Sequence, residues 1–213
     1  MTFDELVTHF GSLPLFDLSA IVQISGGDVT SMRTQLYRWR KSGKIIALRR
    51  GWYTLSDKYR KVVLYQTILA NELYKPSYLS LLWALNYYGL IPERIVTYTS
   101  ITSRVPRTFK NQFGTFEYFH VKQSNFFGFS SHAIQEQQVW LADSEKALLD
   151  FWYLNSGEWT IGRLSTYRFQ NFDLVSCAKL QSYATHFNSP RIFRAVTNWK
   201  RIVDGKKEVD VEL

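Results

Sequence analysis

Cysteine pairs, membrane-length apolar runs and a basic leader are all missing from this chain of 213 residues. Its single cysteine, Cys177, excludes an intrachain disulfide framework and a cysteine-based zinc cluster, and it fits a reducing cytoplasm. No apolar run reaches the ~18 residues of a membrane span. The first ten residues hold two acids and no basic segment, so no secretory signal is expected. These absences predict a cytoplasmic protein without a membrane partner.

Motifs for catalysis or cofactor binding are also scarce. The four histidines are scattered, without the spacing of a metal site. They are His9, His120, His132 and His186. Neither of the common glycine-rich phosphate-binding patterns occurs. We therefore expect no cofactor, no bound metal and no enzymatic activity.

One dense group of ionisable residues keeps an enzymatic alternative open. It consists of Asp143, Glu145, Lys146 and Asp150. A metal-dependent nuclease uses a comparable set of carboxylates and a lysine. However, Glu145 and Lys146 are adjacent, so on a helix they point about 100° apart, and acids at a helix start are favoured by the helix dipole. We prefer the helix start. The alternative is a nuclease, or another enzyme, that uses the N-terminal region for DNA delivery.

Positive charge is abundant and unevenly placed. The formal net charge is +8, and residues 28–50 alone hold seven bases and one acid. Clustered cations bind nucleic-acid phosphates and release condensed counterions, which supplies sequence-independent affinity. A charged helix face is often merely solvated, and a basic turn is often merely a turn. The two features together, in this order near the N-terminus, favour DNA binding.

An amphipathic helix is predicted within this basic segment. Asp28 is a fit N-cap, and Gly43 can adopt the left-handed conformation that ends a helix. One apolar stripe is formed by Val29, Met32, Leu36 and Trp39. The opposite face is polar and cationic.

Two short strands are predicted after this helix, over residues 44–48 and 52–55, joined by a basic turn. Upstream, helices are predicted over residues 2–10, where Thr2 and Glu5 have capping-box spacing, and over residues 15–24. Three helices followed by a two-stranded wing are the plan of a winged helix-turn-helix, which we assign to residues 1–57.

The remainder, residues 58–213, is predicted to be a second domain of mixed structure, so the fold class is α+β. Helices are expected over residues 61–74, 77–89, 145–154 and 173–187, and from Pro190 onward. Strands are expected over residues 94–103, 113–122 and 139–141, with a short strand or loop at 126–129. We expect a small antiparallel sheet with helices packed on it.

Four segments together resemble one known family. RRGWYTL ends the predicted wing, PSYLSLLWALNYYGLIPE covers residues 76–93, FGTFEYFHV covers 113–121, and DSEKALLDFWYL covers 143–154. In this order they resemble the AbiEi family, the antitoxin and transcriptional-repressor half of bacterial AbiE-type (type IV) toxin–antitoxin systems. The resemblance covers at least residues 1–155.

The resemblance implies a repressor that binds operator DNA ahead of its own two-gene operon. It also implies an antitoxin that counteracts a nucleotidyltransferase-type toxin without a stable complex, in plasmid maintenance and phage defence. A stand-alone transcriptional regulator would have the same sequence features. We expect a monomer or weak dimer that pairs on repeated half-sites in DNA.

The predicted DNA contacts come from the polar face of the helix and from the turn. Residues placed to reach base edges in the major groove are Thr30, Ser31, Thr34, Tyr37 and Arg38. Residues placed to hold phosphates are Arg33, Arg40, Lys41, Lys44, Arg49 and Arg50, the last two on the wing.

Two further features lie outside this helix and turn. One face of the last helix carries Arg191, Arg194 and Arg201. Either that face is merely solvated, or it is a second basic patch that contacts phosphates or a partner. A third function class, a domain that binds a protein partner, is left open by the aromatic residues Phe126, Phe127, Phe129 and Trp140.

Overall fold

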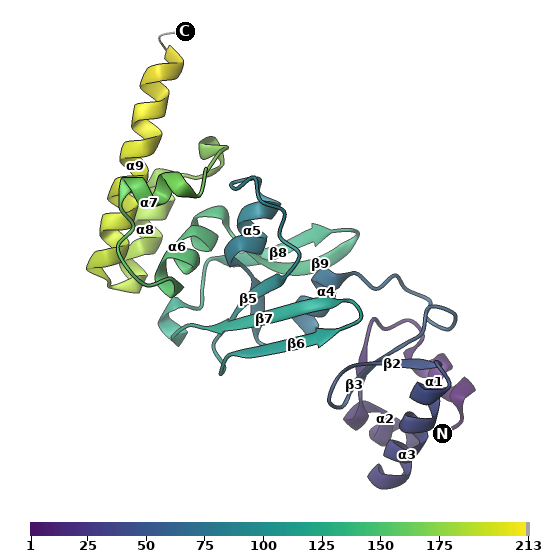
Figure 1. The fold of residues 1–213 in the computed structure, drawn as a ribbon. Helices are drawn as coiled ribbons and strands as arrows, with labels where there is room; N and C mark the ends of the chain where they lie inside the picture. Colours follow the sequence, from purple (N-terminus) through teal and green to yellow (C-terminus); the bar gives the residue numbers. More distant parts are fainter. Residues whose placement is uncertain (212–213) are drawn as a thin grey trace.

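The computed structural model describes the backbone of residues 1–211 and the side chains as far as residue 205. The chain is a mixed α+β protein, with a three-stranded sheet near the N-terminus and a six-stranded sheet after it (Figure 1). The last two residues of the predicted second domain, 212–213, lie outside the described residues. Among residues 1–211, none of the helices has the length and apolarity needed to span a membrane.

Side-chain caps explain where the three N-terminal helices begin. These are α1 (Phe3–Phe10), α2 (Leu18–Ser25) and α3 (Val29–Lys41). Thr2 and Glu5 form the predicted capping box of α1. Asp17 caps α2 and Asp28 caps α3, because each carboxylate accepts a hydrogen bond at 2.8 Å from the backbone N–H three residues on. These local bonds fix the direction in which α3 leaves the preceding turn.

One stripe of α3 packs into the interior, largely as predicted. Met32, Leu36 and Trp39 are buried. Val29, predicted on the same stripe, is 40% exposed. It is the first residue of the helix and lies at the edge of the core, so its place in the stripe was predicted wrongly.

The small sheet has the order β1-β3-β2 and is antiparallel throughout. Its strands are β1 (Phe16–Asp17), β2 (Ile45–Arg49) and β3 (Trp52–Leu55). The helix predicted from residue 15 is wrong at its start, because Phe16 and Asp17 pair with β3 and Asp17 is the cap of α2. In β2, Ala47 pairs with Tyr53 but Arg49 pairs with Trp52, so Leu48 is a bulge.

The larger sheet is mixed, with the order β6-β7-β5-β4-β9-β8. Its strands are β4 (Ser77–Leu79), β5 (Tyr98–Thr102), β6 (Arg107–Asn111), β7 (Gly114–His120), β8 (Phe129–Ile134) and β9 (Gln137–Ala142). The predicted antiparallel sheet is wrong, because β5 pairs with β7 and β4 pairs with β9 in parallel. The unpredicted strand β6 takes the antiparallel position beside β7.

Among residues 58–211, six helices pack on this sheet and on one another. They are α4 (Gln66–Glu72), α5 (Leu81–Tyr87), α6 (Ser144–Leu154), α7 (Ile161–Thr166), α8 (Cys177–Phe187) and α9 (Pro190–Val211). Single 3-10 turns lie at Gln123–Asn125 and Phe172–Leu174. α4 contacts β4, β5 and β9, whereas α5 and α6 pack together and α8 connects α6 to α9. α9 runs away from the end of the molecule that holds the small sheet (Figure 1).

Several predicted helices begin too early. Residues 61–65 are not helical, because the backbone N–H of Lys61 donates to the carbonyl of Gly11 and the segment crosses between the two sheets. The helix predicted over residues 77–89 holds β4 before α5, since a fully buried central strand is as apolar as a buried helix. The helix predicted from residue 173 starts at Cys177, and α7 was not predicted.

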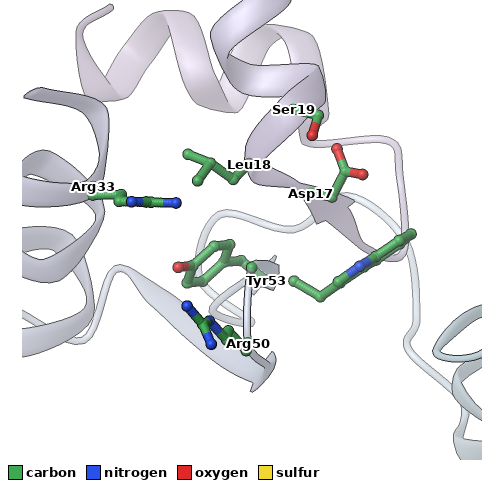
Figure 2. Close-up of a pocket in the computed structure, with 8 residues that line it drawn as sticks. Asp17, Leu18, Ser19, Arg33, Arg50 and Tyr53 are labelled. Atoms are coloured by element: carbon green, nitrogen blue, oxygen red, sulfur yellow. The ribbon is translucent and has the colours of Figure 1, made fainter. Parts of the chain in front are cut away.

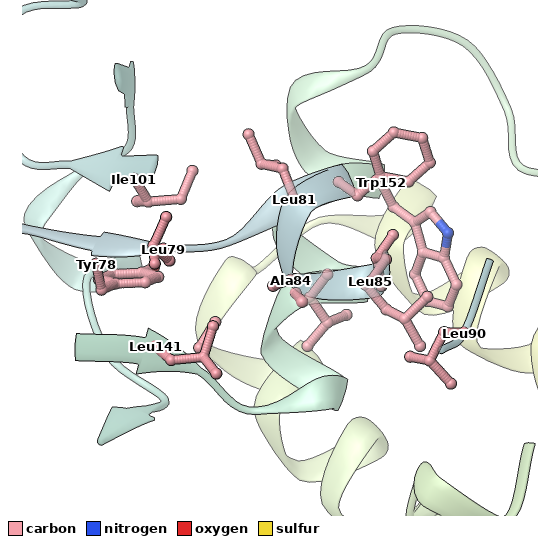
Figure 3. Packing of buried hydrophobic residues seen from close by; sticks show 14 of the residues in the cluster. Tyr78, Leu79, Leu81, Ala84, Leu85, Leu90, Ile101, Leu141 and Trp152 are labelled. Atoms are coloured by element: carbon pink, nitrogen blue, oxygen red, sulfur yellow. The ribbon is translucent and has the colours of Figure 1, made fainter. Parts of the chain in front are cut away.

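Two hydrophobic clusters lie side by side along the chain. The smaller contains Leu6, Phe10, Phe16, Ile21, Met32, Leu36, Trp39, Ile45 and Leu55. The larger extends from the central strands, which carry Leu79, Ile101 and Leu141, to α5 and to Trp152 of α6 (Figure 3). Leu15 and Leu48 belong to the larger cluster although they precede residue 57, so the two parts share packing. The domain boundary at residue 57 stays a prediction.

Candidate nucleic-acid interface

The outward face of α3 carries all five residues predicted to read bases. Thr30, Ser31, Thr34, Tyr37 and Arg38 are exposed. Tyr37 has 57% of its surface in solvent. The buried stripe of α3 holds the helix against the small core and therefore directs this polar face away from the protein. The hydroxyl of Thr34 donates to the carbonyl of Thr30 at 3.2 Å, so its oxygen remains an acceptor.

The predicted phosphate-binding cations of α3 share that outward surface. Arg33, Arg40 and Lys41 are exposed, and the Arg40 guanidinium lies 5.6 Å from the Tyr37 ring centre. Lys44 is half-buried, with its ammonium 4.5 Å from the ring centre of Phe3. Among the side chains described, none of the cations from Arg33 to Arg50 forms an ion pair. Their charge is therefore available to an external anion.

A hollow of about 580 Å³ lies between α3 and the hairpin turn of the small sheet. Arg33 reaches from α3 toward Tyr53, and Arg50 lies beside that ring (Figure 2). The Asp17 carboxylate on the far side of the hollow already accepts the N–H of Ala20. The two arginines thus face one concave surface from two different elements.

Arg49 does not share the exposed position of Arg50. Its guanidinium carbon lies 4.7 Å from the ring centre of Trp52 and 5.5 Å from that of Phe109 on β6. Its Nε is buried without a hydrogen-bond partner in the structure. Burial lowers the pKa of Arg49, and the like charge of Arg104 adds to this effect. The Arg49 side chain, which was predicted to hold a phosphate, therefore lies at the junction between the two sheets and not on the free surface of the turn.

Two arginines of the second basic patch predicted on the last helix are engaged in contacts with other residues of the protein. Arg191 donates to the carbonyls of Trp152, Tyr153, Asn155 and Gly157, at 2.8 to 3.1 Å, and so caps the end of α6. Arg194 makes a two-pronged contact with Glu158, at 3.0 and 2.5 Å. Only Arg201 is exposed without such a contact among the three. The three arginines therefore do not form a continuous free basic surface.

The dense ionisable group is divided into two separate sets of ion pairs, and three of its four members, Glu145, Lys146 and Asp150, are buried. Lys146 and Asp150 form an ion pair in the core, and Tyr78 and Ser80 donate to Asp150 at 3.1 and 2.8 Å. Burial raises the pKa of Asp150 and lowers that of Lys146, although each charge counteracts the shift of the other. Asp143 and Glu145 instead pair with Lys179, at 3.0 and 3.3 Å. In the described part of the chain, no cluster of three His, Cys, Asp or Glu side chains could hold a metal.

The aromatic group predicted as a partner surface lies mostly within the fold. Phe126, Phe127 and Phe129 are half-buried against the larger cluster, and Phe129 stacks on Tyr78 with ring centres 4.3 Å apart. Trp140 is the exposed member, with 49% of its surface in solvent. These side chains therefore serve packing more than they form a continuous apolar surface.

Sequence reasoning missed two arginines near the turn. Arg104 lies in the link between β5 and β6, Arg107 is the first residue of β6, and both are exposed. The signal was present, because SRVPR is a short basic segment between two predicted strands, as RRG is. Only the fold brings the two segments together.

Comparison with models of known protein families, and with curated proteins, gives no match for this chain. The AbiEi resemblance therefore rests on the four sequence segments that suggested it.

Proposed function

We propose that this protein is a sequence-specific DNA-binding repressor, and that residues 1–57 act as its winged helix-turn-helix. In this proposal α3 enters the major groove, with Thr30, Ser31, Thr34, Tyr37 and Arg38 facing base edges. The hairpin of β2 and β3 is the wing, and Arg50 at its turn contacts the DNA backbone.

One observation carries the proposal. Arg33 of α3 and Arg50 of the hairpin turn face the same concave surface. Among the described side chains, none of the cations of α3 and of the turn is paired with a carboxylate. Elsewhere in the described chain some cations are paired with acids, among them Arg60, Lys75, Arg168 and Arg194. Unpaired cations on a helix and an adjacent turn fit a duplex better than a neutral ligand.

The resemblance to AbiEi proteins supplies the biological setting of the proposal. We infer an antitoxin that represses its own operon and neutralises a nucleotidyltransferase-type toxin in the cytoplasm. Co-expression with the toxin encoded beside it would separate this role from that of a stand-alone regulator. Rescue of growth supports the antitoxin role, and growth arrest with intact operator binding supports the regulator. The nuclease alternative is not favoured, because Lys146 and Asp150 are buried and paired.

DNA binding can be tested with the duplex immediately upstream of the gene, compared with a random duplex of equal length at two salt concentrations. Arg38→Ala should weaken operator binding by about 5- to 150-fold, the effect of losing a good base contact of ~1–3 kcal/mol, and should change random-duplex binding far less. Arg50→Ala should weaken both alike.

Lys200→Ala provides the control, since Lys200 is an exposed cation on α9, away from the small sheet. Equal binding of the operator and random duplexes by the unaltered protein would contradict sequence-specific recognition.

A further inference from the structure

A second basic hollow lies between the hairpin turn and the larger sheet. It has a volume of about 740 Å³ and is bordered by Arg49, Arg50, Arg104, Arg107, Tyr74 and Phe109. The four arginines thus form two pairs that are far apart in the sequence. Arg49 and Arg50 lie where β2 enters the hairpin turn, and Arg104 and Arg107 lie where the chain enters β6. β6 is the strand of the larger sheet that lies beside the small sheet, as Figure 1 shows.

Two arginines of this hollow, Arg49 and Arg104, are held in place by neighbours that leave their charge uncompensated. Arg104 lies 4.6 Å from the ring centre of Tyr74 and donates one Nη to the carbonyl of Lys75 at 2.9 Å. Arg49 lies between the Trp52 and Phe109 rings, and its Nε has no hydrogen-bond partner in the structure. Within the described side chains, none of the four arginines forms an ion pair. Like charges gathered in this way favour an anion between them.

The backbone of the junction keeps the two pairs of arginines close together. The side-chain amide of Asn111, at the end of β6, donates to the carbonyl of Leu48 at 3.2 Å. Leu48 itself is 2% exposed and packs in the larger cluster. Arg107 and Phe109 are two residues apart in β6, so they share a face of that strand. The hollow is therefore built by both parts of the protein.

We propose that this hollow binds phosphate, and that the backbone of the duplex lying on α3 supplies it. Arginine suits this ligand because its planar guanidinium donates two parallel hydrogen bonds to phosphate oxygens. The duplex is favoured as the source because Arg50 borders both this hollow and the one that Arg33 borders, so the cationic surface continues from α3 to the larger sheet. The inference rests on the proposed DNA binding and extends its footprint to Arg104 and Arg107.

The first arm of the test measures the salt dependence of duplex binding. For Arg104→Gln/Arg107→Gln, the slope of log K against log salt concentration should become shallower by about 1–2, near 0.9 for each lost phosphate contact. The matched control, Lys200→Gln/Arg201→Gln, removes two exposed cations from α9 and should keep the original slope. Both doubly altered proteins should remain folded and melt close to the unaltered protein, because all four side chains are exposed and, within residues 1–205, only Arg104 loses one hydrogen bond and one ring contact.

The second arm uses inorganic phosphate and no DNA. Phosphate should perturb the NMR resonance of Arg49 Nε in the unaltered protein and in the α9 control, but not in Arg104→Gln/Arg107→Gln. If only this arm responds, the hollow binds phosphate, but a free phosphorylated ligand supplies it and the duplex does not. If only the salt slope changes, the duplex backbone is the source of the phosphate. If the slope is unchanged and phosphate perturbs nothing, the proposal is overturned. If the unaltered protein binds no duplex, the proposed function fails, and the phosphate arm alone decides on the hollow.

Discussion

Two charged side chains of residues 58–213, Lys146 and Asp150, have no exposed surface at all. Their charges are compensated locally, because the Lys146 ammonium donates to both Asp150 and the Tyr78 hydroxyl. The rings of Phe127 and Phe187 lie 5.1 Å from the ammonium and complete its surroundings. A buried pair of this kind adds little net stability compared with apolar residues, but removal of one partner leaves the other charge without compensation.

Asp150→Leu should therefore lower the free energy of unfolding by about 3–5 kcal/mol, because it leaves Lys146 charged in an apolar site. Lys146→Met combined with Asp150→Leu should recover most of that loss, since no charge then remains buried. Urea unfolding of the two variants and the unaltered protein measures both effects. A double variant as unstable as Asp150→Leu would show that packing, and not the unpaired charge, causes the loss.

At the scale of single elements, α3 depends on the cap at its N-terminus. The Asp28 carboxylate accepts the N–H of Ser31, and this bond holds the pKa of Asp28 below its usual value. A lowered pKa means that the cap stabilises the folded protein at pH values above about 4, the ordinary aspartate value. The stabilisation is lost as the pH falls through the lowered pKa, because a protonated carboxyl is a weaker acceptor.

Exchange of the Ser31 amide with solvent should report this cap directly. The rate should be compared with the intrinsic rate of an unstructured peptide at the same pH. In the unaltered protein, the ratio of the observed to the intrinsic rate should rise as the pH falls below about 4. Asp28→Asn retains an acceptor and should remove the acid-dependent part. Asp28→Ala should exchange faster even at pH 7. Slow exchange at pH 7 in Asp28→Ala would show that the cap does not hold this end of α3.

Elements with local signals were predicted well from the sequence. The caps of α1 and α3 are hydrogen bonds between residues three apart, so the letters alone indicate them. β4 was predicted as helix, because its three buried residues have no polar alternation and run directly into α5. The exposed face of α3 followed from its buried stripe. The inward position of Arg49 could not be predicted in this way, since it depends on contact with Phe109, which lies sixty residues further along the chain.

At the scale of the whole molecule, the small N-terminal core is supported by the larger one. Leu48 of β2 is buried in the larger cluster, and its carbonyl accepts the bond from Asn111. The sequence suggested two parts by the winged-helix plan of residues 1–57, but no pattern in it indicated the surface that joins them. A core of nine buried residues is small, so this shared packing is expected to contribute much of its stability.

Leu48→Ala should cost about 2–5 kcal/mol, the range for truncation of a buried leucine. The effect should fall mainly on residues 1–55, where backbone amides should exchange with solvent faster than those of the six-stranded sheet. Hydrogen-exchange mass spectrometry compares the two regions in one experiment. Val63→Ala is the control, because Val63 is 60% exposed between the two parts. Uniform acceleration across both regions would mean that the molecule unfolds as a single unit.

The bulge at Leu48 has a consequence for the contact between the hairpin and the larger sheet. β2 uses two residues where β3 uses one, and the extra backbone unit allows both Leu48 and Arg49 to contact the larger part. Loss of one residue here would restore simple alternation, so a single side chain opposite Trp52, in place of two, would face the larger hydrophobic cluster. The length of one short strand, measured in single residues, thus decides whether the hairpin meets the six-stranded sheet through an apolar and a cationic side chain together or through only one of them.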